Sequence, residues 1–323
     1  MRRDEELFLS LLRSALWGIP VVVSGCDAGM WERVYRLSQL HTVQGLVYDV
    51  VKELPADAGV PRQLAARWML ETRSIETRNR HLSMVAEKQS AIWKRLGIDA
   101  VMLKGLKVAG WYRIPEHRIT GDIDWWFPGT DGWEMALKAV CEMGIEVSVD
   151  SDRDICYTFE GVTIEHHRKG FVCEGPLGWL MLLNTHILHH AQVTGIGMRH
   201  VCDLAIGYKV FKGAYDDAEY ENMLARSGLL RWTVLLHGAM DRLLNLPEGV
   251  LPVFGRKVKV KDSSIDRLAA MFMSDGNFGL HRKRRFAGLF GRIWLFMRCS
   301  PCSFVKRWAG LLAGRVQRSV TLF

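Results

Sequence analysis

Residues 120–127 read Thr120-Gly121-Asp122-Ile123-Asp124-Trp125-Trp126-Phe127, a run with two carboxylates two residues apart among apolar and aromatic side chains. Successive side chains of a β-strand point to opposite faces, so Asp122 and Asp124 are predicted to share one face of a strand. Two neighbouring anions repel each other unless a cation lies between them. Mg²⁺ commonly takes one or two carboxylates and leaves its other positions to water and phosphate oxygens, so the pair predicts a divalent-cation site.

The composition is that of a globular protein with room for about two domains. The chain has 323 residues, of which 49% are hydrophobic and 24% charged, and these values are typical of folded proteins. The seven cysteines are scattered, and acids at positions 4–6 stand where a signal peptide would have its apolar core. No uncharged apolar run of about 18 residues follows. We therefore expect a cytoplasmic protein that does not span a membrane.

The net charge of +8 is concentrated at the end of the chain. Beyond Asp275 there are ten Lys and Arg residues and no acid, which predicts a near-neutral body with a basic tail. The tail contains His281-Arg282-Lys283-Arg284-Arg285 followed by an aromatic, amphipathic stretch. Such a segment suits an anionic partner, either a membrane surface or RNA. The alternative is that the stretch packs on its own domain and the basic run is a solvated face.

Periodicity predicts helices at both ends of the chain and strands between them. Apolar residues at helical spacing predict helices over residues 5–17, 30–51, 61–96, 177–191, 199–211 and 217–246. Strands are predicted beside the aspartate strand at 98–103, 145–149, 155–159 and 162–167, the last two joined by a hairpin turn at Glu160-Gly161. The predicted fold class is α/β (α+β), a small mixed sheet flanked by N- and C-terminal helical regions. The predicted regions are 1–97 (helical), 98–175 (α/β core), 176–250 (helical, completing an active-site cleft) and 251–323 (basic and amphipathic).

Three pieces of the predicted core suit phosphate chemistry. Gly105 follows Lys104 at a strand–helix junction, where a glycine lets backbone N–H groups approach a phosphate. Asp122 lies seventeen residues after this glycine, and Glu165 lies on a later strand. Three carboxylates on neighbouring strands can hold two divalent ions about 4 Å apart, which stabilise the attacking and leaving oxygens of a phosphoryl transfer. Each piece also has a purely structural explanation. Lys104-Gly105 could be an ordinary helix start, the aspartates could mark the end of a surface strand, and Glu165 could be a solvated strand residue.

These residues resemble the hallmark of the nucleotidyltransferase superfamily of the DNA polymerase β type: a glycine after the first strand, a D-x-D strand and a third acid on a later strand. A closer resemblance, over roughly residues 35–245, is to the bacterial family called uncharacterised nucleotidyltransferase. That family carries LKG, R-x-x-x-DID, IELH, LxxHxxxH and R-x-x-x-DLA. The corresponding residues here are Leu103-Lys104-Gly105, Arg118 with Asp122-Ile123-Asp124, Ile164-Glu165-His166, the histidine-rich helix, and Arg199 to Ala205. The more usual Gly-Ser of the superfamily is replaced by Lys104-Gly105. The sequence therefore does not establish which groups would bind the triphosphate.

The resemblance implies a sheet of the nucleotidyltransferase type and a metal site. Asp122, Asp124 and Glu165 would be the catalytic residues and would bind Mg²⁺, with two ions feasible and Mn²⁺ as a substitute. Glu165 or Asp124 would help to deprotonate the acceptor hydroxyl. Lys104, Gly105 and Arg118 would bind the phosphates of an NTP, with ATP as the default nucleotide. For Arg118, an ion pair with a core carboxylate is an equal alternative.

The histidines form a second group of candidates. His186, His189 and His190 fall at i, i+3 and i+4, so they share one face of a helix, and we expect them on the acceptor side of the active site. The spacing of His186 and His190 also suits a transition metal. The remaining alternative is a set of partly buried histidines satisfied by carboxylates such as Asp203. Three further histidines are candidates to lie near: His166, His167 and His200.

The leading hypothesis is a Mg²⁺-dependent enzyme that moves an NMP from an NTP to an acceptor hydroxyl or phosphate. The acceptor is unknown. One alternative is a catalytically inactive nucleotidyltransferase fold used as a binding or regulatory module. A weaker alternative is a metal-dependent phosphohydrolase centred on the histidines, which predicts that an aspartate joins His186 and His190 on one ion. Separately, Arg199 and Asp203 are predicted to form a structural ion pair.

Overall fold

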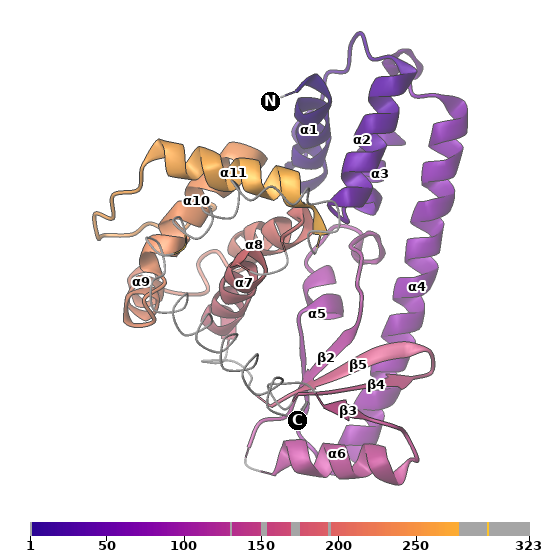
Figure 1. The fold of residues 1–323 in the computed structure, drawn as a ribbon, viewed down its shortest axis with the longest axis vertical. Helices are drawn as coiled ribbons and strands as arrows, with labels where there is room; N and C mark the ends of the chain where they lie inside the picture. The colour runs from indigo at the N-terminus through magenta and orange to yellow at the C-terminus, as the bar shows by residue number, and fades with distance from the viewer. Residues whose placement is uncertain are drawn as a thin grey trace, which may run out of the picture. The chain divides into compact units, whose positions relative to one another are not determined.

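The computed structural model describes residues 2–129, 131–149, 154–168, 175–192, 195–277 and 296. Within these residues the chain forms eleven α-helices and one five-stranded mixed sheet (Figure 1). This confirms the predicted α/β (α+β) class, with helical regions before and after the sheet. The chain divides into two compact units, here called unit 1 (Met1–Glu174) and unit 2 (Gly175–Phe323). No described helix has the length and apolar character needed to cross a membrane.

Unit 1 begins with a group of helices that pack on one another: α1 (Arg3–Trp17), α2 (Ala28–Leu40) and α3 (Gln44–Val51). Their shared interior is apolar and includes the fully buried Phe8 and Trp31. The predicted continuous helix over 30–51 is wrong, because Thr42 takes a left-handed conformation with φ +54°. The backbone N–H of Val43 returns to the carbonyl of Ser38, which ends α2 and redirects the chain into α3.

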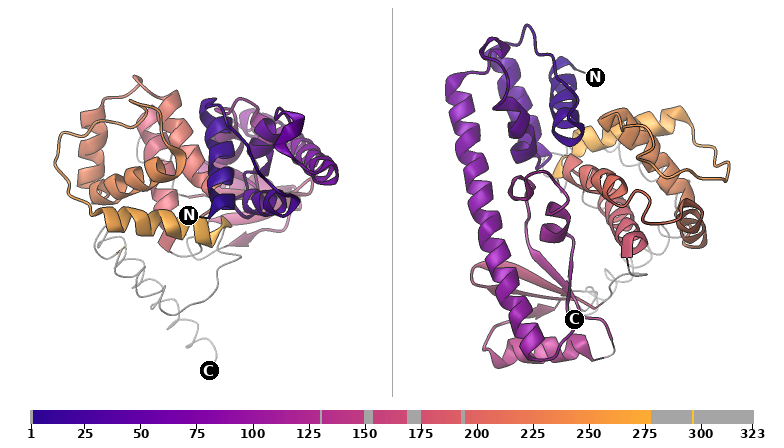
Figure 2. Two further views of the ribbon diagram at one scale, coloured as in Figure 1. Left: turned by 90° about the horizontal axis from the view of Figure 1, so that it is seen from above. Right: turned by 180° about the vertical axis from the view of Figure 1, so that it is seen from behind.

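Helix α4 (Arg62–Arg95) follows a 3₁₀ turn, η1 (Ala56–Ala58), and runs the length of unit 1 (Figures 1 and 2). It confirms the helix predicted over 61–96. Near its start, Trp68 is buried and its indole N–H donates to the carbonyl of Gln44 on α3. Near its end, Val85 and Trp93 are buried in the core under the sheet. One helix therefore joins the N-terminal helices to the sheet.

The sheet of unit 1 has the order β1-β2-β5-β4-β3. Its strands are β1 (Val101–Leu103), β2 (Ile123–Trp126), β3 (Ser148–Val149), β4 (Ile155–Phe159) and β5 (Val162–His167). β2 runs parallel to β5 and the other pairs are antiparallel. Glu160 and Gly161 both have positive φ, as the predicted two-residue hairpin turn requires. The first and third strands are shorter than the predicted 98–103 and 145–149.

One face of the sheet is covered by α4 and by α6 (Gly132–Glu142). Alternate residues of β2 and β5, including Ile123, Trp125 and Ile164, point into this core. Because strand side chains alternate, Asp122, Asp124 and Glu165 point to the opposite face. The apolar residues between the acids therefore fix which way the acids point.

Unit 2 is helical in its described residues: α7 (Gly175–Gln192), α8 (Met198–Val210), α9 (Asp217–Arg226), α10 (Leu230–Leu244) and α11 (Asp262–Asp275). α7 packs on α8 and α10 packs on α11. The predicted single helix over 217–246 is wrong, because Gly228 at φ +69° separates α9 from α10. Buried Asn184 accepts from the indole of Trp232 and donates to Thr233, which ties α7 to α10. The basic run 281–285 and its aromatic stretch lie outside the described residues, apart from residue 296.

Candidate functional site

The register of three strands assembles the candidate site in unit 1. Asp124 on β2 lies directly beside Glu165 on the parallel strand β5. On the other side of β2, Asp124 is paired with Leu103, the last residue of β1. Leu103 is the last residue of β1, so Lys104 is the residue next to the one paired with Asp124. This brings the Lys104 side chain within reach of the buried Asp124 carboxylate. Pieces 41 residues apart in the sequence, Asp124 and Glu165, become neighbours through strand pairing alone.

Asp124 is 3% exposed and is held by two cationic side chains. The Lys104 Nζ lies 3.3 Å from its Oδ1, and the His167 Nε2 lies 2.6 Å from the same oxygen. His167 also places its Nδ1 2.8 Å from Asp154 Oδ2. Carboxylate oxygens only accept hydrogen bonds, so both ring nitrogens must carry hydrogen and His167 is an imidazolium. Asp124 is thus compensated from two sides in a poorly solvated position.

His167 and Asp154 are site residues that the sequence reasoning missed in this role. The signal for His167 was present, because it follows Glu165 by two residues on one strand and must share its face. For Asp154 no such signal exists, since it precedes β4 and reaches the site only through the β4–β5 pairing. His166, the residue between, points the other way into the core and accepts from the Tyr157 hydroxyl.

Lys104 and Gly105 have unusual backbone conformations. Lys104 has φ +42° and ψ −143°, a region that side chains rarely occupy, and this conformation costs about 1–3 kcal/mol. Gly105 also has φ +42°, and a Cβ there would lie 3.2 Å from the Thr120 side chain and 3.3 Å from the Asp122 carbonyl. The strained turn brings the chain from β1 close to the loop before β2. Helix α5 (Gly105–Ala109) has only five residues, so its dipole would contribute little to phosphate binding at Gly105.

The loop that enters β2 is anchored to α4. Buried Asn79 donates to the carbonyls of Glu116 and Arg118, at 2.6 and 2.9 Å. Arg78 donates to the carbonyl of Gly121, the residue before the aspartate strand. Arg118 itself is 5% exposed, and its guanidinium donates to Ile119 O at 3.1 Å. Arg118 follows the 3₁₀ turn η2 (Pro115–His117), and its predicted roles in phosphate binding or in an ion pair with a core carboxylate stay predictions.

The charges at the site shift the pKa values of Lys104 and Asp124 in opposite directions. For Lys104, burial is the largest influence and lowers the pKa, but the charges of Asp124, Asp122 and Glu165 together outweigh it and raise the pKa above 10.5. For Asp124, burial raises the pKa, but Lys104 and His167 outweigh it and hold the pKa below its usual value. Both groups therefore remain charged at neutral pH.

Glu165 differs from Asp124 in exposure and in pKa. Its side chain is 38% exposed, and burial together with the charges of Asp124 and Asp122 raises its pKa. The influence of Asp122 on this pKa means that its charge lies close to Glu165. For His167, burial lowers the pKa, but the hydrogen bond and charge of Asp124 outweigh it and raise the pKa. Glu165 is thus the more accessible of these two carboxylates. Because its pKa is raised and that of Asp124 is lowered, Glu165 is protonated first as pH falls.

Asp124 and Glu165 fit a divalent cation, and His167 could join them as a ligand only after its Nε2 loses the proton that it donates to Asp124. Each offers one donor atom, and these atoms lie within 4.8 Å of one another. Two carboxylate oxygens suit Mg²⁺ or Mn²⁺, and an imidazole nitrogen is tolerated better by Mn²⁺. Asp122, the residue before β2, acts on the pKa values of Lys104 and Glu165, but it is not among the residues whose ligand atoms converge within 4.8 Å. The donor set therefore fits the metal that the sequence resemblance implies.

Comparison with protein families agrees with this geometry. Residues 27–177 match the uncharacterised nucleotidyltransferase family. The match contains β1, the aspartate strand and β5, and it confirms the predicted resemblance over those residues. It ends before the LxxHxxxH and R-x-x-x-DLA segments, so the resemblance predicted to extend to about residue 245 is shorter in this comparison. Searches of curated proteins and of solved structures gave no match.

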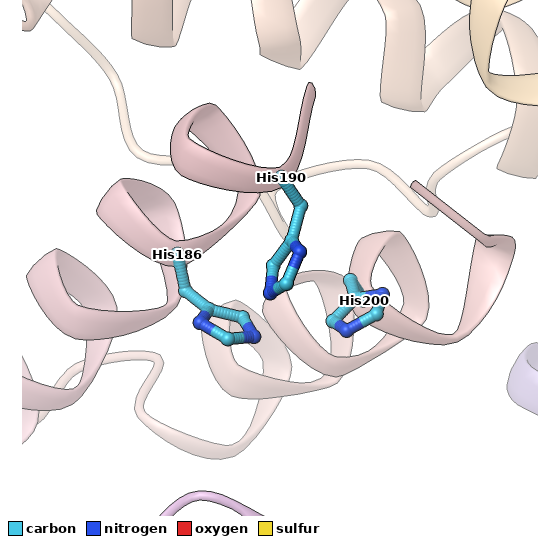
Figure 3. A group of neighbouring side chains, drawn as sticks. All are labelled: His186, His190 and His200. Atoms are coloured by element: carbon cyan, nitrogen blue, oxygen red, sulfur yellow. The ribbon is translucent and has the colours of Figure 1, made fainter. Parts of the chain in front are cut away.

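Beyond the nucleotidyltransferase match, in unit 2, three histidines converge. His186 and His190 of α7 have ring centroids 4.3 Å apart, and His200 of α8 lies 5.3 and 5.2 Å from them (Figure 3). One nitrogen of each ring lies within 4.8 Å of the others. His189 is exposed and lies outside this group. The expectation that His186, His189 and His190 belong to the acceptor side stays a prediction.

Arg199 and Asp203 are both buried on α8, at 9% and 2% exposed. Four residues separate them, so they share one face of the helix. Their predicted ion pair remains a prediction.

Proposed function

We propose that unit 1 catalyses divalent-metal-dependent transfer of a nucleoside monophosphate from an NTP to an acceptor hydroxyl or phosphate. The observation that carries this proposal is the parallel register that sets Asp124 beside Glu165, with Lys104 Nζ 3.3 Å from Asp124. The match of residues 27–177 to a nucleotidyltransferase family supports the same reaction class. The preferred ion is Mg²⁺ with Mn²⁺ as a substitute, and ATP is the default nucleotide.

In this reaction an acceptor oxygen forms a bond to the α-phosphorus. The bond from that phosphorus to the α,β-bridging oxygen breaks, and pyrophosphate leaves. The acceptor proton goes to a carboxylate. Asp124 is almost fully buried, whereas Glu165 is 38% exposed, so of these two carboxylates Glu165 is the one open to an incoming acceptor. We therefore assign Glu165 as the general base.

Asp124, Glu165 and Asp122 would hold the divalent ion, and His167 orients the Asp124 carboxylate through its Nε2. When bound, the ion neutralises phosphate charge and lowers the barrier for the developing negative charge. Lys104 places a fixed positive charge beside the same carboxylate, and this charge is available to phosphate oxygens. The strained backbone at Lys104 supports a functional role for its position.

One observation favours a second candidate, a catalytically inactive module that binds or regulates. Lys104 and His167 already compensate Asp124, so this buried carboxylate needs no added ion to be stable in the fold. A module of this kind would bind its ligand without breaking the α–β bond of an NTP. The two candidates therefore differ in whether label from the α-phosphate is transferred.

The test is incubation of purified protein with each [α-³²P]NTP, Mg²⁺ and a cell extract as the source of acceptor. Wild type is compared with Asp124→Asn and Glu165→Gln, which keep the side-chain shapes. Glu142→Gln, on the exposed end of α6, is the matched surface control. A parallel reaction with [γ-³²P]ATP separates nucleotidyl from phosphoryl transfer.

We expect label from the α-phosphate, and none from the γ-phosphate, to appear on an acceptor with wild type and with Glu142→Gln. Asp124→Asn and Glu165→Gln should transfer at least about 100-fold less, since each loses a metal ligand or the base. Equal transfer by wild type and both site variants would exclude the proposed catalytic roles. Nucleotide binding without transfer, in every extract, would support the inactive module.

A further inference from the structure

The histidines of unit 2 come from two helices that pack on each other. His186 and His190 are one turn apart on α7 and project side by side, and His200 faces them from the first turn of α8 (Figure 3). Their three ring centroids are 4.3–5.3 Å apart. One nitrogen from each imidazole lies within 4.8 Å of the other two. Three nitrogen donors thus point at one small volume.

The position of His200 is fixed by its helix. α8 is buried almost all round, and His200 itself is 5% exposed. Gly197, just before α8, lies so close to Asn277 that a Cβ would be 3.2 Å from the Asn277 backbone. This close approach fixes the start of α8 against the end of α11. Sites supported on packed helices hold their ligands with less freedom than sites on loops.

The chemistry of the group selects among metals. In the described residues the group offers three imidazoles and neither carboxylate nor thiolate. Imidazole suits Zn²⁺, Co²⁺, Ni²⁺ and Cu²⁺, whereas Mg²⁺ requires oxygen ligands. A tetrahedral ion held by three histidines keeps its fourth position for water or an anion. His186 and His190 are only partly buried, so an ion and its fourth ligand can reach the group from solvent.

We propose that His186, His190 and His200 form a first-row transition-metal site of the Zn²⁺ class, with one coordination position open to water or an oxyanion. The site is separate from the carboxylates of unit 1 in both residues and metal preference. Its third ligand is a histidine, where the phosphohydrolase hypothesis expected an aspartate. The proposal does not depend on nucleotidyl transfer.

A competing physical explanation is aromatic packing of neutral imidazoles without an ion. His186 and His190 have an interplanar angle of 76°, an edge-to-face arrangement that rings also adopt without metal. The two explanations differ in stoichiometry. Packing predicts no bound ion, whereas the proposed site binds one.

The test uses the full-length protein, stripped of metal with a chelator and desalted into buffer with excess Mg²⁺, which occupies oxygen sites. Zn²⁺ binding is measured by isothermal titration calorimetry, and Co²⁺ binding by the intensity of its visible absorption, which reports coordination number. The variants are His186→Ala and His190→Ala. The matched control is His189→Ala, the exposed neighbour on the same helix. Asp124→Asn and Glu165→Gln control for binding in unit 1.

Wild type, His189→Ala, Asp124→Asn and Glu165→Gln should each bind one Zn²⁺ equivalent and give a four-coordinate Co²⁺ spectrum. His186→Ala and His190→Ala should weaken binding by more than the roughly 10–100-fold that loss of a group supporting a ligand costs. Both residues are partly exposed, so these variants are expected to keep the wild-type circular dichroism. No Zn²⁺ binding by wild type, undiminished binding by the two variants, or loss of the ion in the unit 1 variants would each overturn the proposal.

Discussion

Lys104 shows how a single residue serves the site at the expense of backbone energy. Its φ of +42° and ψ of −143° are ordinary for glycine and costly for lysine. The same conformation delivers the ammonium to 3.3 Å from Asp124. A residue selected for stability alone would be glycine here, so the lysine indicates a function for its charge.

Lys104→Gly and Lys104→Ala separate these two contributions. Both variants remove the charge beside Asp124, but only glycine relieves the backbone. Lys104→Gly should therefore be more stable to unfolding than Lys104→Ala by about 1 kcal/mol, after allowing for the greater entropy of glycine in the unfolded chain. Urea denaturation followed by circular dichroism measures the difference. Equal stability of the two variants would mean that position 104 carries no strain.

His117 predicts a pH dependence of stability that is independent of the metal site. Its two ring nitrogens lie 2.8 Å from Asp49 Oδ1 and 2.8 Å from Glu76 Oε1. Burial lowers the pKa of His117, but the hydrogen bonds to Asp49 and Glu76 outweigh it and raise the pKa above 6.5. Hydrogen bonding to His117 is the largest influence on Glu76 and lowers its pKa below 4.5. His117 and Glu76 are therefore both charged between pH 4.5 and 6.5.

His117→Gln should cost about 1.5–3 kcal/mol between pH 4.5 and 6.5. A histidine whose pKa is raised by folding contributes its full stabilisation at pH values below its pKa in the unfolded chain. This stabilisation is lost as pH rises through its pKa in the folded protein. The difference in free energy of unfolding between wild type and His117→Gln should therefore become smaller as pH rises. It should also become smaller in acid, as Glu76 is protonated. Urea midpoints measured across pH provide the curve. A gap that stays constant or widens above pH 6.5 would contradict the assigned charge of His117.

Much of the site could be predicted at this scale because strand alternation is a strict rule. It places Asp124 and Glu165 on the face opposite the core, and the same rule applied to β5 would have placed His167 beside Glu165. Asp154 and the anchoring role of Asn79 could not be predicted. Both act through tertiary contacts, one across the β4–β5 pair and the other between α4 and the loop before β2.

Among the elements, α4 positions the sheet through a buried polar chain as well as through apolar packing. The Trp125 indole donates to Gln89 Oε1 at 2.8 Å, and Gln89 Nε2 donates to the Tyr157 hydroxyl at 2.9 Å. Tyr157 in turn donates to His166 Nε2. Burial, with a smaller contribution from the charge of His167, lowers the pKa of His166 to about 3, so His166 stays neutral and can accept this bond. The chain links α4 to β2, β4 and β5.

Gln89→Leu should destabilise the protein by about 2 kcal/mol, because it leaves the buried Trp125 N–H without its acceptor. Combining it with Trp125→Phe removes both partners. The double variant should then be more stable than the sum of the two single losses predicts, by about 1 kcal/mol. Urea denaturation of the four proteins completes the cycle. Strict additivity would show that the bond between Gln89 and Trp125 contributes nothing to stability.

A helix could be predicted well where the periodic apolar pattern continues over many turns, as in α4. The prediction failed where a single residue ends one helix and another begins directly after it. Thr42 interrupts the helix predicted over 30–51 through a left-handed conformation that threonine seldom adopts. Sequence preference therefore gave no warning. Gly228 does give a warning, since glycine is the usual residue after a helix end. Short edge strands such as β3 depend on their partner and are weakly marked in sequence.

On the scale of the whole molecule, the two units carry candidate metal sites with different donors. Unit 1 offers carboxylates with one imidazole, and unit 2 offers three imidazoles in the described residues. Oxygen-rich and nitrogen-rich groups prefer different ions, so the protein is expected to bind two classes of metal independently. The basic tail is visible in the charge distribution of the sequence, and the four predicted regions, 1–97, 98–175, 176–250 and 251–323, stay predictions. The anionic partner of the tail stays a prediction, because residues 281–285 lie outside the described ones.

The central claim is that Asp124 and Glu165 hold the metal of a metal–nucleotide complex. Label transfer depends on an unknown acceptor, whereas metal–nucleotide binding needs none. The most direct measurement is therefore Mn²⁺ binding by electron paramagnetic resonance, with and without an ATP analogue whose α,β-bridge is a methylene group and cannot be cleaved. A His186→Ala/His190→Ala background removes the nitrogen site of unit 2.

In that background, the analogue should increase Mn²⁺ binding, and Glu142→Gln should behave the same way. Asp124→Asn and Glu165→Gln should each abolish the nucleotide-dependent increase. Glu165 is partly exposed, so its variant keeps the test valid if replacement of the buried Asp124 perturbs folding. Undiminished nucleotide-dependent Mn²⁺ binding in Asp124→Asn and Glu165→Gln would contradict the account.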